Sequence, residues 1–161
     1  MKKQILFGYG QSAKAVANEL DKKDFSIVIF NEDEKISAKN DNYLDVYLLA
    51  NEILDDDLIK VGIQESEIAI CALEDEARNL FLSLSIRNIN KKIKIIAKSK
   101  DKEYYHRYKL AGVNKIISPF DIVAKRIDTI LKKPFTIDII HSIVFEDTDL
   151  YFSQVEIIKN S

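Results

Sequence analysis

The stretch Ile5–Leu20, "ILFGYGQSAKAVANEL", joins a short apolar run to a glycine pair and then to an amphipathic segment. Gly8, Gly10 and Ala13 have the spacing of a loop that binds a dinucleotide between a strand and a helix. In such a loop the first glycine makes the turn, the second lets the backbone approach the phosphates, and the helix N-terminus faces the anion. The sequence therefore predicts a phosphate-binding loop here, with a simple strand-to-helix turn as the alternative.

The composition is that of a folded protein of about one domain. The chain has 161 residues, of which 47% are hydrophobic and 31% charged. A net charge of -2 argues against a nucleic-acid partner, which would need clustered Lys and Arg. The lysines between 91 and 102 are followed by acids, which favours a solvated surface over an anion-binding face. No apolar run approaches the roughly 20 residues of a bilayer crossing.

The cysteine and histidine counts limit the chemistry. Cys71 is the single cysteine, so it cannot form an internal disulfide, and a reducing cytoplasm is the expected location. It lies in the apolar run "IAICAL", where a packed strand residue is expected. With two histidines and one cysteine we expect no zinc site. We also find no catalytic arrangement and expect no enzyme activity.

Short runs rich in Ile, Val and Phe recur along the chain, with amphipathic segments between them. Most of these runs are apolar at consecutive positions, as in parallel strands that helices cover on both faces. The right-handed crossover rule turns this alternation into an α/β fold, a Rossmann-like doubly wound parallel sheet of six strands. The expected strands are Gln4–Phe7, Ser26–Phe30, Val46–Leu49, Ile68–Ala72, Lys94–Ala97 and Lys115–Ile117.

Helices are expected between these strands. The acids Asp55–Asp57 should begin one of them, because carboxylates are favoured near a helix N-terminus. Another should cover Lys102–Leu110 and end at Gly112. Two apolar stripes are expected to be buried, namely Ala13, Val16, Ala17 and Leu20 in the first helix and Ala77, Leu80, Phe81, Leu84 and Ile86 in a later one.

The chain after Pro119 no longer shows this alternation of strands and helices. A helix is expected over Phe120–Leu131, followed by a second apolar segment from Phe135 to Val144 and a last strand-like piece, "LYFSQVEII". So much apolar surface outside a finished sheet usually marks an interface. We expect these segments to pack on another subunit or on a further C-terminal part.

An acidic residue that holds ribose hydroxyls should follow the second strand. The sequence there is "IVIFNEDE", in which Asn31 directly follows the strand and Glu32 and Asp33 come next. The Asn31 amide can bond a hydroxyl but lacks the charge of a carboxylate, for which Asp33 could substitute. In the alternative interpretation these acids only solvate a loop.

Together, "ILFGYGQSA", "IVIFNEDE", "LIKVGIQESEIAICALEDEARNLF", "KIIAKSK" and "KLAGVNKIISPFDIVAKRI" resemble the RCK domain, also called the TrkA-N domain. The resemblance covers roughly residues 3–131, and Ser118–Phe120 is closer to the channel-attached members. It implies a cytoplasmic domain of a potassium channel at the inner face of the cell membrane. It also implies a Rossmann-like domain over residues 1–131. Residues 132–161 would form a crossover helix and strand leading to a C-terminal lobe that is essentially missing.

In this family, swapped crossover helices pair the domains. The resemblance therefore implies a homodimer, or an octameric ring built from such dimers, whose ligand binding is coupled to gating. The ligand would be an adenine nucleotide, ATP, ADP or NAD/NADH, with its identity left open. The alternatives are a TrkA-like NAD-binding subunit of a potassium uptake system, a small NAD(P)-dependent oxidoreductase, and a ring module with a vestigial cleft.

The family's nucleotide contacts carry over onto several positions. Gln11 stands where many members place an arginine, and Asn31 and Asn51 replace two aspartates. Lys98 and Lys100 replace the acids through which some channel members bind calcium, so no metal site is expected. The complete set of candidates is Gly8, Tyr9, Gly10, Gln11, Ser12, Ala13, Asn31, Glu32, Asp33, Asn51, Ala72, Leu73, Glu74, Asn79 and Lys98.

Overall fold

The computed structural model describes residues 4–50 and 53–132 and divides the chain into two units, residues 1–120 and 121–161. The first unit holds a sheet of six parallel strands in the order β3-β2-β1-β4-β5-β6. This confirms the doubly wound α/β fold, and each expected strand boundary lies within one residue of the observed one. The strands are β1 (Gln4–Phe7), β2 (Phe25–Ile29), β3 (Val46–Leu48), β4 (Ile68–Cys71), β5 (Lys94–Lys98) and β6 (Lys115–Ile117).

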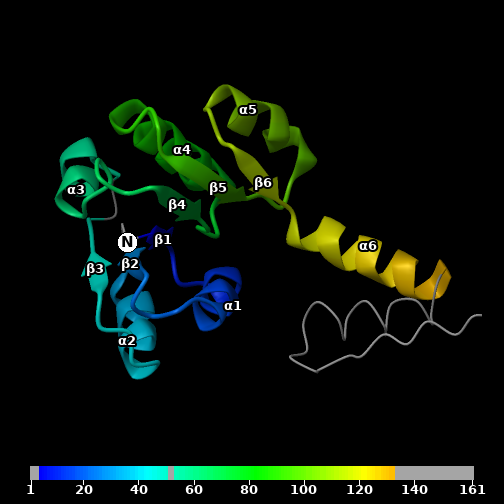
Figure 1. Cartoon of the computed structure of the whole chain (residues 1–161), viewed down its shortest axis with the longest axis horizontal. Helices are drawn as coiled ribbons and strands as arrows, with labels where there is room; N and C mark the ends of the chain where they lie inside the picture. The colour runs from blue at the N-terminus through cyan, green and yellow to red at the C-terminus, as the bar shows by residue number, and fades with distance from the viewer. Residues whose placement is uncertain (1–3, 51–52, 133–161) are drawn as a thin grey trace, which may run out of the picture. The chain divides into compact units, whose positions relative to one another are not determined.

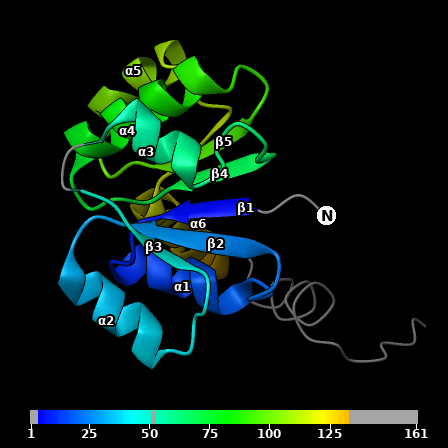
Figure 2. The same ribbon diagram turned by 90° about the vertical axis from the view of Figure 1, so that its left-hand side faces the viewer.

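Helices cover both faces of this sheet. Figures 1 and 2 show α1 and α2 on one side and α3, α4 and α5 on the other. The helices are α1 (Gln11–Glu19), α2 (Glu32–Asn40), α3 (Asp55–Lys60), α4 (Glu76–Ile89), α5 (Tyr105–Leu110) and α6 (Pro119–Lys132), with a 3-10 turn at Lys102–Tyr104.

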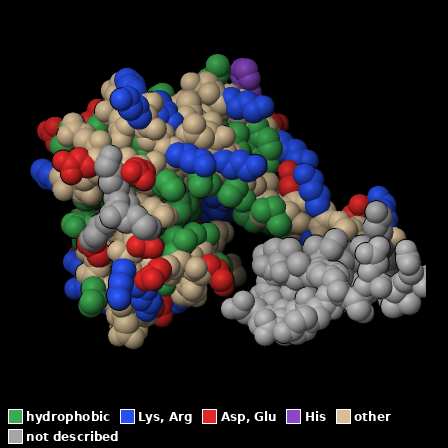
Figure 3. All heavy atoms as spheres, in the orientation of Figure 1, with side chains coloured by type: hydrophobic (Ala, Val, Ile, Leu, Met, Phe, Trp, Pro, Cys, Tyr) green, Lys and Arg blue, Asp and Glu red, His purple; other side chains and the backbone are tan. Residues whose placement is uncertain are grey.

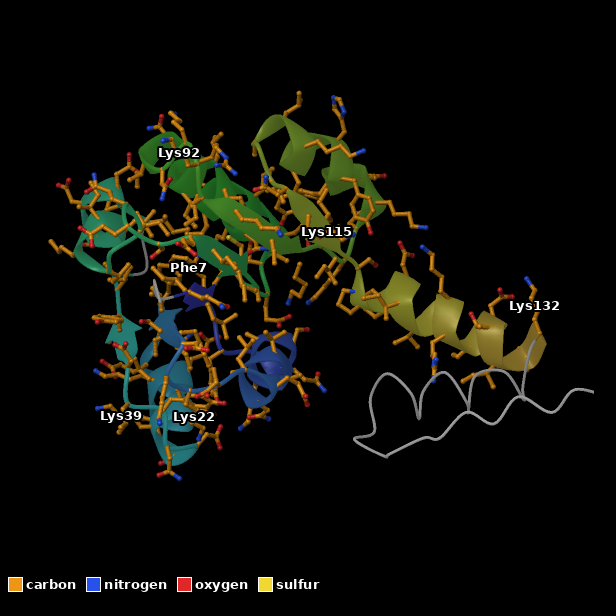
Figure 4. All side chains as sticks on the ribbon, in the orientation of Figure 1. Phe7, Lys22, Lys39, Lys92, Lys115 and Lys132 are labelled. Carbon is orange, nitrogen blue, oxygen red and sulfur yellow. The ribbon has the colours of Figure 1, made fainter. Side chains whose placement is uncertain are left out.

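The alternation of side chains along β1 divides the core in two. Ile5 and Phe7 belong to the cluster that contains Leu82 of α4, whereas Leu6 belongs to the cluster that contains Ala13 of α1. Phe7, the last residue before the glycine loop, lies in the middle of the fold (Figure 4) and is completely buried. Burial on both faces is the reason why this strand is apolar at consecutive positions.

Several local expectations are confirmed. Helix α3 begins at Asp55, with three acids in its first turn. Gly112 follows α5 in the left-handed region, at φ +81°. Cys71 is completely buried, and this burial raises the pKa of its thiol to about 12. Tyr108 of α5 is also completely buried.

The expected buried faces of α1 and α4 are partly wrong. Val16 is 36% exposed, and Phe81 and Leu84 are each 52% exposed. Helix α4 has apolar residues on more than one side, so its sequence did not decide which side faces the sheet. Small polar residues can face the sheet because the Ser83 hydroxyl donates to the Asn79 carbonyl, 2.8 Å away. The residues that α4 buries are Asn79, Leu82, Ser83, Ser85 and Ile86.

Helix α6 confirms the helix expected after Pro119, and its apolar side chains are exposed. They are Phe120, Ile122, Val123, Ile127, Ile130 and Leu131. Figure 4 labels Lys132 at the end of this helix. The second apolar segment and the expected last strand lie outside the described residues. Within residues 4–50 and 53–132, no helix has both the length and the apolar character that a membrane crossing requires.

Candidate functional site

The candidate site lies where the strand order reverses. β1 has β2 on one side and β4 on the other, and the helices that follow β1 and β4 pack on opposite faces of the sheet. In sheets of this type, ligands bind beyond the carboxyl ends of the strands at such a switch point. The glycine loop follows β1 directly, and residues 72–75 follow β4. The fold therefore brings these two predicted segments together.

Gly8 makes the turn that the sequence predicts. Its φ is +93°, and its N–H donates to the Val28 carbonyl at 2.8 Å. A Cβ at Gly8 would lie 3.1 Å from the Ala72 carbonyl oxygen and 3.2 Å from a methyl carbon of Leu73. Gly8 thus combines a left-handed backbone with close packing on the residues after β4.

Gly10 supplies the helix end. It is the N-cap of α1, and the structure records no side-chain cap for this helix. The first N–H groups of a helix lack intrahelical partners and carry a partial positive charge, so they favour an anion. Ala13 is completely buried and lets the first turn pack on the sheet. Gln11 is exposed and Ser12 half-buried at the same helix end.

Tyr9 ties the loop to α2. Its backbone N–H donates to a carboxylate oxygen of Glu34 at 3.2 Å, and its hydroxyl donates to Asp41 at 2.8 Å. Lys14 forms an ion pair with the same Asp41 at 2.7 Å. Burial, followed by the hydrogen bond to Asp41, raises the pKa of the Tyr9 hydroxyl. The side chain of Tyr9 is therefore buried and bonded within the protein.

Glu34 is a residue that the sequence analysis missed. Its signal was present, because Asn31 and Glu34 have the spacing of a helix capping pair. Asn31 is the N-cap of α2, and its side-chain oxygen accepts the Glu34 N–H at 2.8 Å. Glu32 and Asp33 are exposed to solvent, as in the alternative interpretation, but they lie in the first turn of α2 and not in a loop. The ribose contacts assigned to this segment stay a prediction.

Glu74 reaches over the glycine loop from the other side. Its Oε1 lies 2.7 Å from the place where a Cβ on Gly10 would be. The same oxygen accepts from Lys98 Nζ at 2.8 Å, and Oε2 accepts from Lys100 Nζ at 2.6 Å. The ammonium groups, that of Lys100 first, hold the pKa of the Glu74 carboxyl below its usual value.

These contacts correct the interpretation of the lysine-rich segment as a solvated surface at one position, Lys98, whereas Lys91, Lys92, Lys94, Lys100 and Lys102 are exposed as expected. The Lys98 side chain is only 6% exposed and is paired with an acid. Its position explains the difference, because it ends β5 beside the end of β4. On the face drawn in Figure 3, basic and acidic side chains are interspersed. No group of three metal-ligating side chains occurs within the part of the chain that the structure describes.

Asn79 holds the ends of β4 and β5 together. It is completely buried, its side-chain oxygen accepts the Leu73 N–H at 3.0 Å, and its amide donates to the carbonyls of Cys71 at 3.1 Å and Lys98 at 2.9 Å. Asn79 therefore positions Leu73 and Lys98 instead of presenting its own amide at the loop. Ala72 is also buried. Asn51 lies outside the described residues.

Two curated relatives of this chain are potassium channel proteins of Methanocaldococcus jannaschii. Potassium channel protein 1 is 28% identical over 159 residues, which are 97% of this chain and 47% of the relative. Probable potassium channel protein 2 is 29% identical over 160 residues, 96% of this chain and 46% of the relative. The chain thus spans about half the length of the curated relatives it matches.

Solved structures share the fold. The RCK domain of GsuK superposes with a TM-score of 0.69 at 22% identity over 84% of this chain and 29% of that one. The GsuK channel bound to NAD gives 0.67 at 21% identity, over 84% and 24% of the two chains. GsuK bound to ADP gives 0.64 at 22% identity, over 81% and 34%. The family model of the TrkA-N domain matches residues 4–119, which are most of the chain, and this chain therefore belongs to the TrkA-N domain family.

Proposed function

We propose that this chain is a ligand-sensing regulatory domain of a potassium channel, acting in the cytoplasm at the inner face of the cell membrane. The observation that carries the proposal is the Gly8–Gly10 loop, which puts an uncapped helix N-terminus at the switch point of the sheet. The names of the two archaeal relatives support a potassium channel as the partner. The domain works by binding, without turnover of its ligand.

The ligand is an adenine nucleotide. The helix N-terminus and the backbone of the loop provide the partial positive charge that a phosphate requires. NAD and ADP are ligands of the similar GsuK channel, which supports the same class here. The neutral Asn31 after β2 and the exposed Gln11 leave ATP, ADP, NAD and NADH as the candidates to be compared.

A dimer transmits the signal. Phe120, Val123, Ile127 and Ile130 recur at spacings of three and four along α6, and all four are exposed. This spacing makes a seam suited to a second helix. A nucleotide that binds one arrangement of the two domains more tightly shifts the pair toward it, and typical couplings of about 1–3 kcal/mol per site add up around a ring.

The test combines the mass of the protein in solution with thermal melting in ATP, ADP, NAD and NADH. We expect a dimer whose melting temperature rises with one of these nucleotides, because a ligand that binds only the folded state stabilises it. Gly10→Asp should abolish this rise, since it adds a carboxylate at the loop. Ala15→Asp is the matched control, because it adds the same charge at an exposed position one turn further along α1.

Two results would contradict the proposal. A monomer that oxidises NADH would indicate an oxidoreductase. A melting temperature that none of the four nucleotides changes would indicate a structural ring module.

A further inference from the structure

We propose that Glu74 is a built-in competitor of the ligand's phosphate, and that a phosphate binds by displacing this carboxylate from the glycine loop and pairing with Lys98 and Lys100 in its place. The proposal rests on the proposed function, because it assumes that the loop receives a phosphate. It adds the step by which the site is opened and the two side chains that hold the anion afterwards.

The position of Glu74 is the first argument. Its Oε1 is the atom nearest to the place of a Cβ on Gly10, at 2.7 Å, and its Cγ is 2.9 Å away. Because Gly10 has no side chain, the Glu74 carboxylate can occupy this space in the structure. In a phosphate-binding loop the second glycine admits the phosphate instead. The carboxylate and the phosphate thus require the same space.

A second carboxylate shows independently that this loop attracts anions. The Tyr9 N–H, between the two glycines, donates to Glu34 at 3.2 Å. Glu34 comes from α2 and Glu74 from the segment after β4, so acids from two separate parts of the chain converge on one short loop. Backbone N–H groups in such a turn are the donors that carboxylates and phosphates share.

The lysine pair fits a phosphate at least as well as a carboxylate. Each oxygen of Glu74 accepts from one ammonium group, Oε1 from Lys98 and Oε2 from Lys100. A terminal phosphate has three such oxygens and carries about -1.5 to -2 charges against -1 for the carboxylate. It can engage both lysines and still present an oxygen to the loop. Lys98 is only 6% exposed and is paired with a carboxylate in this structure, so a phosphate that displaces Glu74 gives it a replacement partner.

The structure lets Glu74 leave without disturbing its partners. Its side chain is 46% exposed and lies between the end of β4 and the start of α4. The backbone at Leu73 stays fixed by Asn79, so a rotation of the Glu74 side chain is sufficient. Glu76 binds the Ser99 hydroxyl and the Lys100 N–H, which keeps the lysine segment in place during the exchange.

Calorimetric titration with ADP, in the absence of divalent cations, tests the exchange. Glu74→Gln keeps the shape of the side chain but removes its charge, and should tighten ADP binding about 3- to 10-fold. Glu19→Gln removes the same charge at the exposed far end of α1 and should leave the affinity unchanged. In Glu74→Gln/Lys100→Gln the gain should be lost, because the phosphate then lacks one ammonium partner. Adenosine, which has no phosphate, should bind wild type and Glu74→Gln equally.

The outcomes separate this inference from the proposed function. If wild type binds ADP and Glu74→Gln binds it no more tightly, the displacement is wrong and the proposed function stands. If only Glu74→Gln binds ADP, the displacement is supported and the sensing of ADP by the natural chain fails. If no variant binds ADP, the displacement is wrong, because releasing the lysines does not create an anion site, whereas the proposed function fails only if ATP, NAD and NADH also leave the melting temperature unchanged. Circular dichroism and melting temperature verify that each variant is folded.

Discussion

At the scale of single residues, Gly8 and Gly62 form a matched pair for separating backbone strain from crowding. Both lie in the left-handed region, at φ +93° and +87°, but a Cβ at Gly62 would have no atom within 4 Å, whereas one at Gly8 would meet the Ala72 carbonyl at 3.1 Å. Gly62→Ala should cost about 1–2 kcal/mol of unfolding free energy from strain alone. Gly8→Ala should cost about 1 kcal/mol more, because the packing against residues 72 and 73 must also give way.

Urea denaturation of the two variants measures this difference. Equal losses of stability would mean that the segment after β4 moves aside freely, and that Gly8 is needed only for its backbone conformation.

The carboxyl of Glu74 makes stability depend on pH in a defined direction. The ammonium groups of Lys100 and Lys98 lower its folded-state pKa below the usual 4.5. A lowered acid pKa gives stability that is present above the usual value and is lost as the pH falls through the folded-state value. Because Glu74 is 46% exposed, the contribution should stay below about 1 kcal/mol.

The measurement is the free energy of unfolding of wild type and Glu74→Gln from neutral pH down to acid pH. The advantage of wild type should be largest at neutral pH and should shrink below pH 4.5. A difference between the two proteins that is the same at every pH would show that the ion pairs do not contribute.

At the scale of elements, the start of α2 depends on Asn31. Its side chain accepts the Glu34 N–H at 2.8 Å, and Asp can make the same cap. Asn31→Ala should lower the unfolding free energy by about 1 kcal/mol. Asn31→Asp should change it by less than about 0.5 kcal/mol and should tighten NAD binding, because a carboxylate accepts from a ribose hydroxyl more strongly than an amide does. Chemical denaturation and NAD titration test the two effects, and equal destabilisation by both variants would contradict the cap.

The elements also show what the sequence could predict. The strands were located within one residue because burial on both faces makes them apolar at consecutive positions, a signal that a single sequence carries. The buried face of α4 could not be predicted in this way, because the exposed Phe81 and Leu84 are as apolar as the buried Leu82. The loop Gly8–Gly10 was found from its spacing, whereas the convergence of Glu34 and Glu74 on it depends on which strands are neighbours.

At the scale of the whole molecule, the exposed seam of α6 predicts how two copies associate. Val123 and Ile127 lie in the seam and are 57% and 53% exposed, while Thr129 is exposed near the opposite side of the same helix. Wild type should have twice the 18.5 kDa mass of the chain in solution. Ile127→Glu should convert it to a monomer, because the carboxylate would have to be buried against an apolar partner helix without a counter-charge.

Thr129→Glu is the matched control, since it adds the same charge away from the seam and should leave the dimer intact. Light scattering over a range of protein concentrations measures both masses. The nucleotide titration is then repeated on Ile127→Glu. If the loop and the dimer are coupled, the affinity of the monomer should differ from that of wild type, because binding no longer shifts an equilibrium between two arrangements of a pair. A dimer that survives Ile127→Glu would place the dimer interface elsewhere in the chain. An unchanged nucleotide affinity in a true monomer would mean that ligand binding is not coupled to the arrangement of the two domains.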